Sequence, residues 1–319
     1  MTRAVVFAYH NVGVRCLRVL AAHGVDVRLV VTHADDPHEN RWFGSVADVA
    51  LECGIPTCTP DNPNAADVVA RVRALDPEFL FSFYYRVLLA APLLALPTRG
   101  ALNMHGSLLP RYRGRAPVNW AVLHGERETG ATLHYMTEKA DAGDIVAQSA
   151  VPILPDDTAR EVLDKVTVAA EVALDGVLPA LISGTAPRRP QDLAAGRYFG
   201  ARRAQDGIID WSLHARAIHN LVRAVAPPYP GALTTLRGMP ARVLRTRVLD
   251  AASAAASPVI EARDGRLLVR CGGGGTLSVL ALEIAGTLCS AQAFLARFGN
   301  DPVALPQLGS SEASSAGDV

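Results

Sequence analysis

Short apolar runs alternate with amphipathic helical segments through the first 83 residues of the chain. Three runs have the length and composition of strands buried on both faces of a parallel sheet, at residues 4–9, 25–32 and 79–83. Between them, apolar side chains recur at helical spacing in residues 11–23, 43–53 and 65–75. This alternation predicts an α/β fold with a doubly wound, Rossmann-like parallel sheet and right-handed crossovers.

The pattern changes after about residue 205. A long amphipathic helix is expected at residues 158–181, and a Pro-, Arg- and Gly-rich linker follows it. Beyond the linker, one helix precedes five short β segments at residues 232–236, 241–248, 259–262, 267–271 and 276–282. We therefore expect a catalytic domain, a linker, a small open β-barrel of OB type and a disordered tail, at residues 1–190, 191–205, 206–305 and 306–319.

Composition excludes several classes of protein. The 31 basic residues balance 31 acidic ones, so the charge gives no support for binding to nucleic acid. No apolar run approaches the roughly 18 residues of a membrane span, and the amino terminus does not resemble a signal peptide. The five scattered cysteines indicate neither a disulfide framework nor a zinc site. We expect a cytoplasmic protein without a metal or membrane insertion, and homo-oligomerisation stays open.

An amide, an imidazole and a carboxylate are the chemistry-bearing groups of residues 102–146. Asn103 and His105 are two residues apart, so on an extended chain they point to the same face of a strand end. Asp141, folded back against His105, would fix one tautomer and raise the pKa of the imidazole. The Asn103 amide could donate to an oxygen that gains negative charge. Together these groups are suited to acyl transfer without a covalent enzyme intermediate.

Other polar residues of the chain are weaker candidates for these roles. Asp144, in a Gly-Asp turn, is the rival carboxylate, and His124 and His134 are interpreted as structural. His10 is a further candidate, because the first turn of such a sheet faces the site. That turn lacks the Gly-x-Gly-x-x-Gly motif, which disfavours a nicotinamide cofactor, and the glycines at residues 272–275 read as a hairpin loop.

The chain resembles the folate-dependent formyltransferase family. The resemblance rests on Asn103-Met104-His105-Gly106-Ser107-Leu108-Leu109-Pro110, Arg113-Gly114, Pro117, Trp120 and Ala140-Asp141-Ala142-Gly143-Asp144-Ile145. It implies formyl transfer from 10-formyltetrahydrofolate and places the catalytic roles on Asn103, His105 and Asp141. It also implies that the folate contacts Val87, Leu88, Leu89, Arg115, Thr137, Glu138, Lys139, Ala140 and Asp141.

Two kinds of family member compete. Methionyl-tRNA formyltransferases typically carry a basic insertion after the second strand, whereas residues 33–39 here are acidic, and lysine occurs only at Lys139 and Lys165. Residues 4–305 are similar to the formyltransferase domain of the bifunctional enzymes that act on UDP-4-amino-4-deoxy-L-arabinose in lipid A modification and polymyxin resistance. The expected partner is therefore a nucleotide-linked amino sugar. The dehydrogenase half of those enzymes has no counterpart here, so we expect another polypeptide to supply the oxidative step. A non-catalytic folate-binding homologue is the third alternative.

Overall fold

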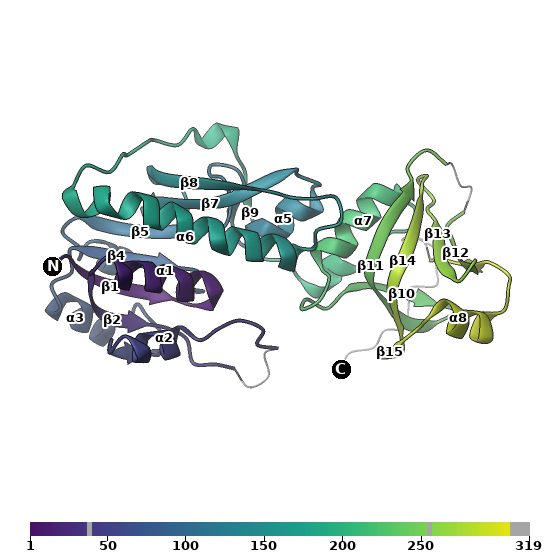
Figure 1. Ribbon diagram of the computed structural model, residues 1–319, viewed down its shortest axis with the longest axis horizontal. Coiled ribbons are helices and arrows are strands. Elements are labelled where there is room, and N and C mark those ends of the chain that lie inside the picture. Colours follow the sequence, from purple (N-terminus) through teal and green to yellow (C-terminus); the bar gives the residue numbers. More distant parts are fainter. Residues whose placement is uncertain (37–39, 254–256, 307–319) are drawn as a thin grey trace. The chain divides into compact units, whose positions relative to one another are not determined.

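The computed structural model describes residues 1–36, 40–253 and 257–306. Its residues divide into two units, which are described separately (Figure 1). The first unit contains residues 1–118, 128–152 and 162–201. The second contains residues 119–127 and 153–161 together with the chain from Arg202 onward. The predicted tail at 306–319 lies, apart from its first residue, outside the described residues.

A seven-stranded sheet forms the centre of the first unit, in the order β3-β2-β1-β4-β5-β7-β8. Its strands are β1 (Arg3–Ala8), β2 (Asp26–Val31), β3 (Thr57–Cys58), β4 (Phe79–Phe83), β5 (Gly100–His105), β7 (Glu128–Tyr135) and β8 (Ile145–Pro152). The first five of these in sheet order run parallel, which confirms the predicted Rossmann-like arrangement. β7 and β8 extend the sheet in the antiparallel direction. β7 is buried almost throughout.

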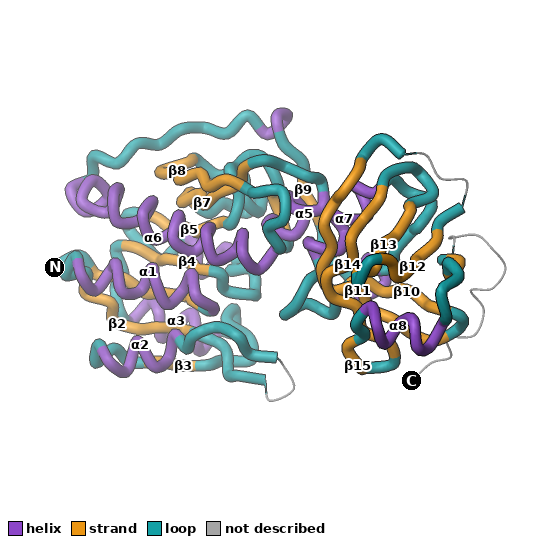
Figure 2. Tube along the Cα trace, turned by 45° about the vertical axis from the view of Figure 1, so that its right-hand side comes forward, coloured by secondary structure: helices purple, strands orange, loops and turns teal. Residues whose placement is uncertain are grey.

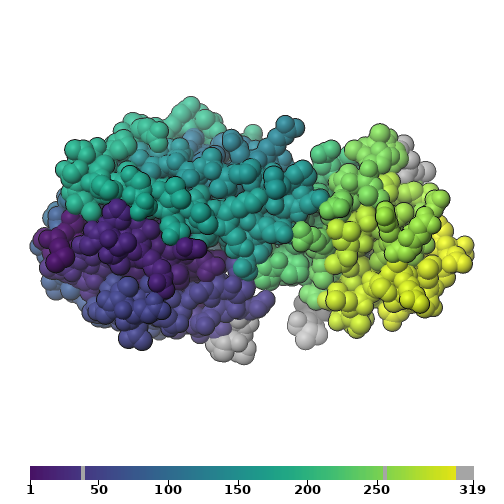
Figure 3. Space-filling model, in the orientation of Figure 1, coloured from purple at the N-terminus to yellow at the C-terminus, as the bar shows by residue number. Residues whose placement is uncertain are grey.

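Helices cover both faces of this sheet. On one face α1 (His10–Ala22) lies beside α2 (Val46–Glu52) and α6 (Ala159–Ser183), and ion pairs Arg15–Glu171 and His23–Asp175 join α1 to α6 (Figures 1 and 3). The other face packs against α3 (Ala66–Ala74) and α4 (Ala91–Leu94). Among the described residues, α6 alone is long and apolar enough to span a membrane by length and composition. Half of its most apolar window is buried within the protein, as in the core helix of a globular fold.

The segment predicted as a linker makes regular contacts with the first unit. It contains a short 3₁₀ helix, η1 (Leu193–Ala195), and the strand β9 (Tyr198–Phe199). β9 pairs in parallel with β6 (Arg113–Gly114), which lies in the loop after β5. Residues up to 201 therefore belong to the first unit rather than to a free connection.

The second unit is built on a curled antiparallel sheet, visible in Figure 2, with the order β10-β11-β14-β13-β12-β16. The strands are β10 (Ala232–Leu236), β11 (Met239–Asp250), β12 (Val259–Arg263), β13 (Arg266–Arg270), β14 (Thr276–Ile284) and β16 (Val303–Ala304), and β15 (Thr287–Leu288) pairs with β14. The helices are α5 (Pro117–Leu123), η2 (Ala204–Gly207), α7 (Ala215–Ala224) and α8 (Ala291–Phe298). Trp211 is buried in the core beside α7. The open β-barrel expected from the sequence is confirmed, and the glycines at residues 272–275 form the predicted hairpin loop between β13 and β14.

Candidate active site

Asn103 and His105 lie in the second half of β5, and His105 is its last residue. Because alternate residues of a strand point to the same side, the two share one face, and Met104 between them is buried in the core. β5 lies between β4 and β7, and Asn103 is opposite Ser82 on one side and His134 on the other. His105 is 6 % exposed. The predicted placement at a strand end therefore brings an amide and a buried imidazole together.

Asp141 approaches His105 from the loop between β7 and β8. Its Oδ1 lies 3.5 Å from His105 Nδ1, and its Oδ2 accepts a hydrogen bond of 2.8 Å from the Gly114 N–H. The other ring nitrogen of His105 donates to the Tyr112 carbonyl over 2.8 Å, because a carbonyl oxygen can only accept. Both nitrogens of His105 thus face oxygen acceptors, and each contact by itself stabilises a proton on that nitrogen.

His134 completes the group and was interpreted from the sequence as structural. Its Nδ1 lies 2.9 Å from the Tyr135 carbonyl oxygen, so the proton belongs on Nδ1 and Nε2 is left to accept from the Asn103 amide over 3.2 Å. The same Nε2 lies 3.6 Å from Asp141 Oδ1. His134 is brought beside Asn103 by the antiparallel register of β5 with β7, which the sequence alone does not reveal.

Burial and charge act on the site in opposite directions. Burial lowers the pKa of His105 and outweighs Asp141 and the Tyr112 carbonyl, which raise it. Burial alone would raise the pKa of Asp141, but His105, His134 and the Gly114 N–H together hold it well below its usual range. Asp141 thus raises the pKa of the imidazole as expected, but desolvation of the buried ring exceeds this effect, so the net pKa of His105 is lowered.

The loop after His105 is fixed by a set of buried hydrogen bonds. The Ser107 hydroxyl donates to the Arg111 carbonyl over 2.6 Å, and the Thr132 hydroxyl donates to the Ser107 carbonyl over 2.6 Å. The Gln148 amide donates to the Leu109 carbonyl over 2.9 Å. These contacts hold in place the Tyr112 carbonyl and the Gly114 N–H, which contact His105 and Asp141.

The residues predicted to contact folate lie in two loops and, for Arg115, directly after β6. Val87 and Leu88 are exposed after β4, whereas Leu89 packs against the same core cluster as Met136, the residue before Thr137. The Leu88 carbonyl accepts a hydrogen bond of 3.0 Å from Asn64. Thr137, Glu138 and Lys139 are exposed, Ala140 is half-buried, and Arg115 is exposed while its N–H donates to the Phe199 carbonyl over 2.9 Å. Parts of both loops thus pack against one core cluster, and the second loop carries Asp141.

Asp144 and His10 have different surroundings. The Asp144 carboxylate lies 3.6 Å from Arg188 at the surface. The centroid of the His10 ring lies 4.3 Å from the centroid of the Phe43 ring and 6.2 Å from that of the Tyr84 ring. A Cβ at Gly106 would overlap the Tyr84 hydroxyl, so this aromatic cluster reaches the residue that follows His105. Its position agrees with the expectation that the first turn of the sheet faces the site.

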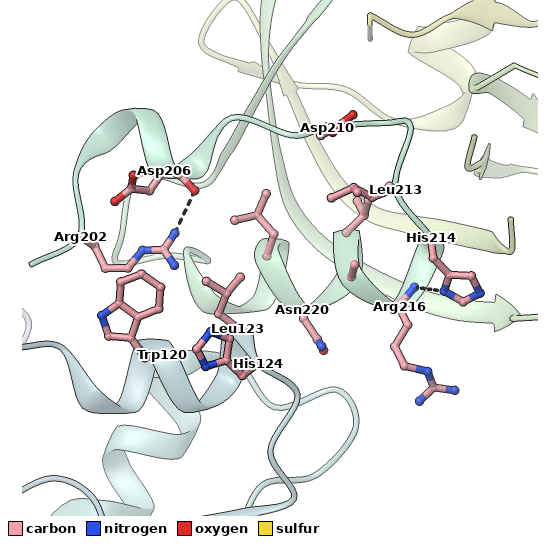
Figure 4. Close-up of a pocket in the computed structure, with 13 residues that line it drawn as sticks. Trp120, Leu123, His124, Arg202, Asp206, Asp210, Leu213, His214, Arg216 and Asn220 are labelled. Atoms are coloured by element: carbon pink, nitrogen blue, oxygen red, sulfur yellow. Dashed lines mark hydrogen bonds between the residues drawn. The ribbon is translucent and has the colours of Figure 1, made fainter. Parts of the chain in front are cut away.

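A cavity of about 690 Å³ lies within the second unit and is drawn in Figure 4. The Arg202 guanidinium carbon is 4.9 Å from the centre of the Trp120 ring and the group donates to the Asp206 carbonyl. His124 lines this cavity, with its ring 5.7 Å from that of Trp120. None of the residues predicted for catalysis or for the folate lines the cavity.

Comparison with known families agrees with the geometry. A family model described as formyl transferase matches residues 12–178, and a model described as the C-terminal domain of formyl transferase matches residues 202–299. The chain belongs to the formyl transferase family. It carries both domains of such an enzyme, and the family resemblance inferred from its motifs is confirmed at this level.

Solved structures share the fold at low sequence identity. An N-formyltransferase from Helicobacter canadensis, in complex with folinic acid and dTDP-3-aminofucose, is 18 % identical with a TM-score of 0.68, covering 88 % of this chain and 99 % of its own. WlaRD, a sugar 3N-formyl transferase, is 18 % identical with a TM-score of 0.68, covering 87 % and 97 %. A sugar N-formyltransferase from Shewanella sp. FDAARGOS_354 is 19 % identical with a TM-score of 0.59, covering 73 % and 92 %.

Proposed function

We propose that this formyltransferase moves a formyl group from 10-formyltetrahydrofolate to the amino group of a nucleotide-linked amino sugar. The observation that carries the proposal is the meeting of Asn103, His105 and Asp141 at one point on the sheet. Membership of the family supports the chemistry. The likeness in fold to two sugar N-formyltransferases crystallised with folate derivatives supports the choice of donor and acceptor class.

The reaction forms a bond from the acceptor nitrogen to the formyl carbon and breaks the bond from that carbon to the folate nitrogen. The attacking amine loses a proton, the carbonyl oxygen becomes negative, and the leaving nitrogen gains a proton. Each of these changes requires a group of the protein.

Asn103 is proposed to stabilise the oxyanion. Its amide has two N–H donors, of which one is directed to His134, leaving the other for the carbonyl oxygen of the formyl group. A preorganised donor of this kind contributes about 10²–10³ in rate. His134 then acts through Asn103 by holding the plane of the amide.

His105 is proposed to accept the proton from the amine and to return it to the leaving nitrogen. Because burial lowers its pKa, the imidazole is neutral at neutral pH and can act as a base. For Nε2 to take the amine proton, the neutral ring must carry its own proton on Nδ1, which faces Asp141, and Nε2 must leave the Tyr112 carbonyl for the acceptor. Asp141 remains ionised throughout and stabilises the imidazolium that forms.

The folate is proposed to lie between the loop of Val87, Leu88 and Leu89 and the loop of residues 137–141. The exposed side chains of Val87 and Leu88 offer an apolar surface to a flat heteroaromatic ring. Arg115 is exposed and its backbone is fixed by Phe199, so its guanidinium is available to a carbonyl or carboxylate group of the folate.

For the acceptor we propose UDP-4-amino-4-deoxy-L-arabinose, the substrate used in lipid A modification and polymyxin resistance. Stretches outside the site resemble the enzymes of that sugar and support this choice, at residues 5–10, 32–37, 43–47, 60–62 and 81–86. The absence of net charge supports a nucleotide sugar over methionyl-tRNA, since phosphate contacts supply much of the affinity for nucleic acid. All five cysteines are unpaired, which fits a reducing cytoplasm.

The test offers the purified protein 10-formyltetrahydrofolate with one of three acceptors: UDP-4-amino-4-deoxy-L-arabinose, dTDP-linked amino sugars or methionyl-tRNA. We expect an N-formylated UDP sugar by mass spectrometry and no product with His105→Ala. A product with dTDP sugars alone would correct the nucleotide and the sugar. Efficient formylation of methionyl-tRNA, with none of the sugars, would overturn the acceptor class. Folate binding without any product would favour a non-catalytic homologue.

A further inference from the structure

Asp141 holds its carboxylate against His105 in an unfavourable backbone conformation. Its φ of +53° lies in the left-handed region, which a residue with a Cβ occupies only when its surroundings impose it. Two residues later, a Cβ at Gly143 would overlap the Tyr135 carbonyl, so the loop also passes very close to β7. Contacts from elsewhere must therefore keep residues 141–143 in this shape.

The side chain of Gln191 makes two of these contacts. Its Nε2 donates to the Asp141 carbonyl over 3.1 Å and to the Gly143 carbonyl over 2.6 Å. The orientation of the amide is determined by these partners, because a flipped amide would place Oε1 against two carbonyl oxygens. One side chain thus satisfies the backbone on both sides of Ala142.

The segment that carries Gln191 is itself fixed on both sides. Arg189 and Ile145 exchange backbone hydrogen bonds of 2.8 and 2.9 Å just beyond the Asp141 loop. At the other end, the Arg197 and Phe199 carbonyls accept from the N–H groups of Arg113 and Arg115. Gly114 lies between Arg113 and Arg115 in the chain, and its N–H donates to the Asp141 carboxylate. The segment therefore joins the loop that holds Asp141 to the loop that holds its hydrogen-bond donor.

We propose that Gln191 is a positioning residue for formyl transfer, which acts by holding the backbone of residues 141–143 so that the Asp141 carboxylate stays against His105. The inference rests on the proposed function for its kinetic consequence. The geometric part, the link from Gln191 to the environment of His105, does not depend on which acceptor is used.

Loss of the Gln191 donors has a defined effect on His105. The titratable groups that face its ring are Asp141 and His134, and the Tyr112 carbonyl faces its Nε2. Once residues 141–143 relax, the carboxylate moves away and the positive charge on the ring loses its main stabilising partner. The pKa of His105 then falls further, and the acidic limb of the pH–rate profile moves to lower pH.

The main variant is Gln191→Met, which keeps the length of the side chain and removes both donors. Gln191→Asn is the second variant, because its amide is too short to reach both carbonyls and it changes the polarity of the site least. The matched control is Asp192→Asn, next in the chain, whose carboxylate accepts from the Ala194 N–H in η1. Circular dichroism and thermal unfolding establish that each variant is folded.

Two readouts are measured on each protein. The first is the pKa of His105 from an NMR titration without substrates, and the second is kcat against pH for the acceptor that the wild type uses. We expect both Gln191 variants to lower the His105 pKa and to reduce kcat by about 10- to 100-fold, as small misplacements of catalytic groups do. Asp192→Asn should match the wild type in both.

Two results would overturn the proposal. One is a His105 pKa in both Gln191 variants equal to that of the wild type. The other is a loss of kcat that follows the loss of thermal stability, with no change in the acidic limb. If the wild type forms no product with any acceptor, the proposed function fails, while the NMR titration still decides whether Gln191 controls the environment of His105.

Discussion

At the residue scale, the Asp141 carboxylate has three partners within the site. His105 and His134 both face its Oδ1, and the Gly114 N–H donates to its Oδ2. The same carboxylate therefore affects the base directly and the Asn103 amide through His134. Because these groups are packed together, substitutions among them should not have additive effects.

His105→Ala and Asn103→Ala each remove one proposed chemical function. We expect each to lower kcat by about 10²–10⁴, because the first loses the proton carrier and the second the oxyanion donor. Folate affinity, measured by fluorescence titration, should stay within a few-fold of the wild type. Near-native rates in both variants would place the active site elsewhere on the molecule.

Asp141→Asn keeps the size of the side chain and removes its charge. The pKa of His105, already lowered by burial, then loses the carboxylate that raises it, so the acidic limb of the pH–rate profile should move to lower pH while kcat falls. Asp144→Asn is the matched control, since its carboxylate faces Arg188 at the surface. An inactive Asp144 variant beside a normal Asp141 variant would reverse the choice of carboxylate.

At the element scale, the segment of residues 189–199 determines how the site loops are held. It pairs with Ile145 at one end and with β6 at the other, and it carries Gln191 between them. A sequence rich in Pro, Arg and Gly has the composition of a linker, yet its backbone groups are used in hydrogen bonds. The boundary between the units therefore falls after this segment rather than within it.

Limited proteolysis should distinguish the two parts of the predicted linker. We expect the first cuts after about residue 200, because proteases need a segment that leaves its hydrogen bonds, and residues 189–199 are bonded to the first unit. Mass spectrometry of the early fragments locates the cuts. Initial cleavage between residues 189 and 199 would show that the pairing with Ile145 and β6 does not hold the segment in solution.

At the scale of the whole molecule, each unit buries a histidine. His105 lies in the first unit, and His219 of the second donates from Nε2 to the Pro155 carbonyl over 2.9 Å. Burial lowers the pKa of both below the ordinary value of about 6.5. A group with a lowered folded-state pKa takes up its proton first in the unfolded chain, so acidification favours unfolding.

The free energy of unfolding should therefore fall as pH drops below about 6.5, and continue to fall until the folded-state pKa values are passed. Urea unfolding at a series of pH values measures this slope. His124 also has a pKa lowered by burial and contributes to the slope. His219→Gln removes one of these groups and should reduce the slope without moving the pH–rate profile. An unfolding free energy that is constant between about pH 7.5 and 5 would contradict the burial of both rings.

The sequence by itself predicted the alternation of strands and helices up to residue 83 and the five β segments of the second unit, because periodicity and turn residues are local properties. It also identified Asn103, His105 and Asp141 as a group, since the family pattern spans them in a fixed order. The roles of these residues and of the predicted folate contacts remain predictions. The α/β fold and the open barrel are confirmed.

Only the tertiary structure decided which groups surround these residues. The register of β5 against β7 places His134 beside Asn103, and this pairing joins residues that are far apart in the chain. The contact of Gln191 with Asp141 and Gly143 depends on where the segment after α6 packs. The net lowering of the His105 pKa depends on burial, which is a property of the packed sheet rather than of any neighbour in sequence.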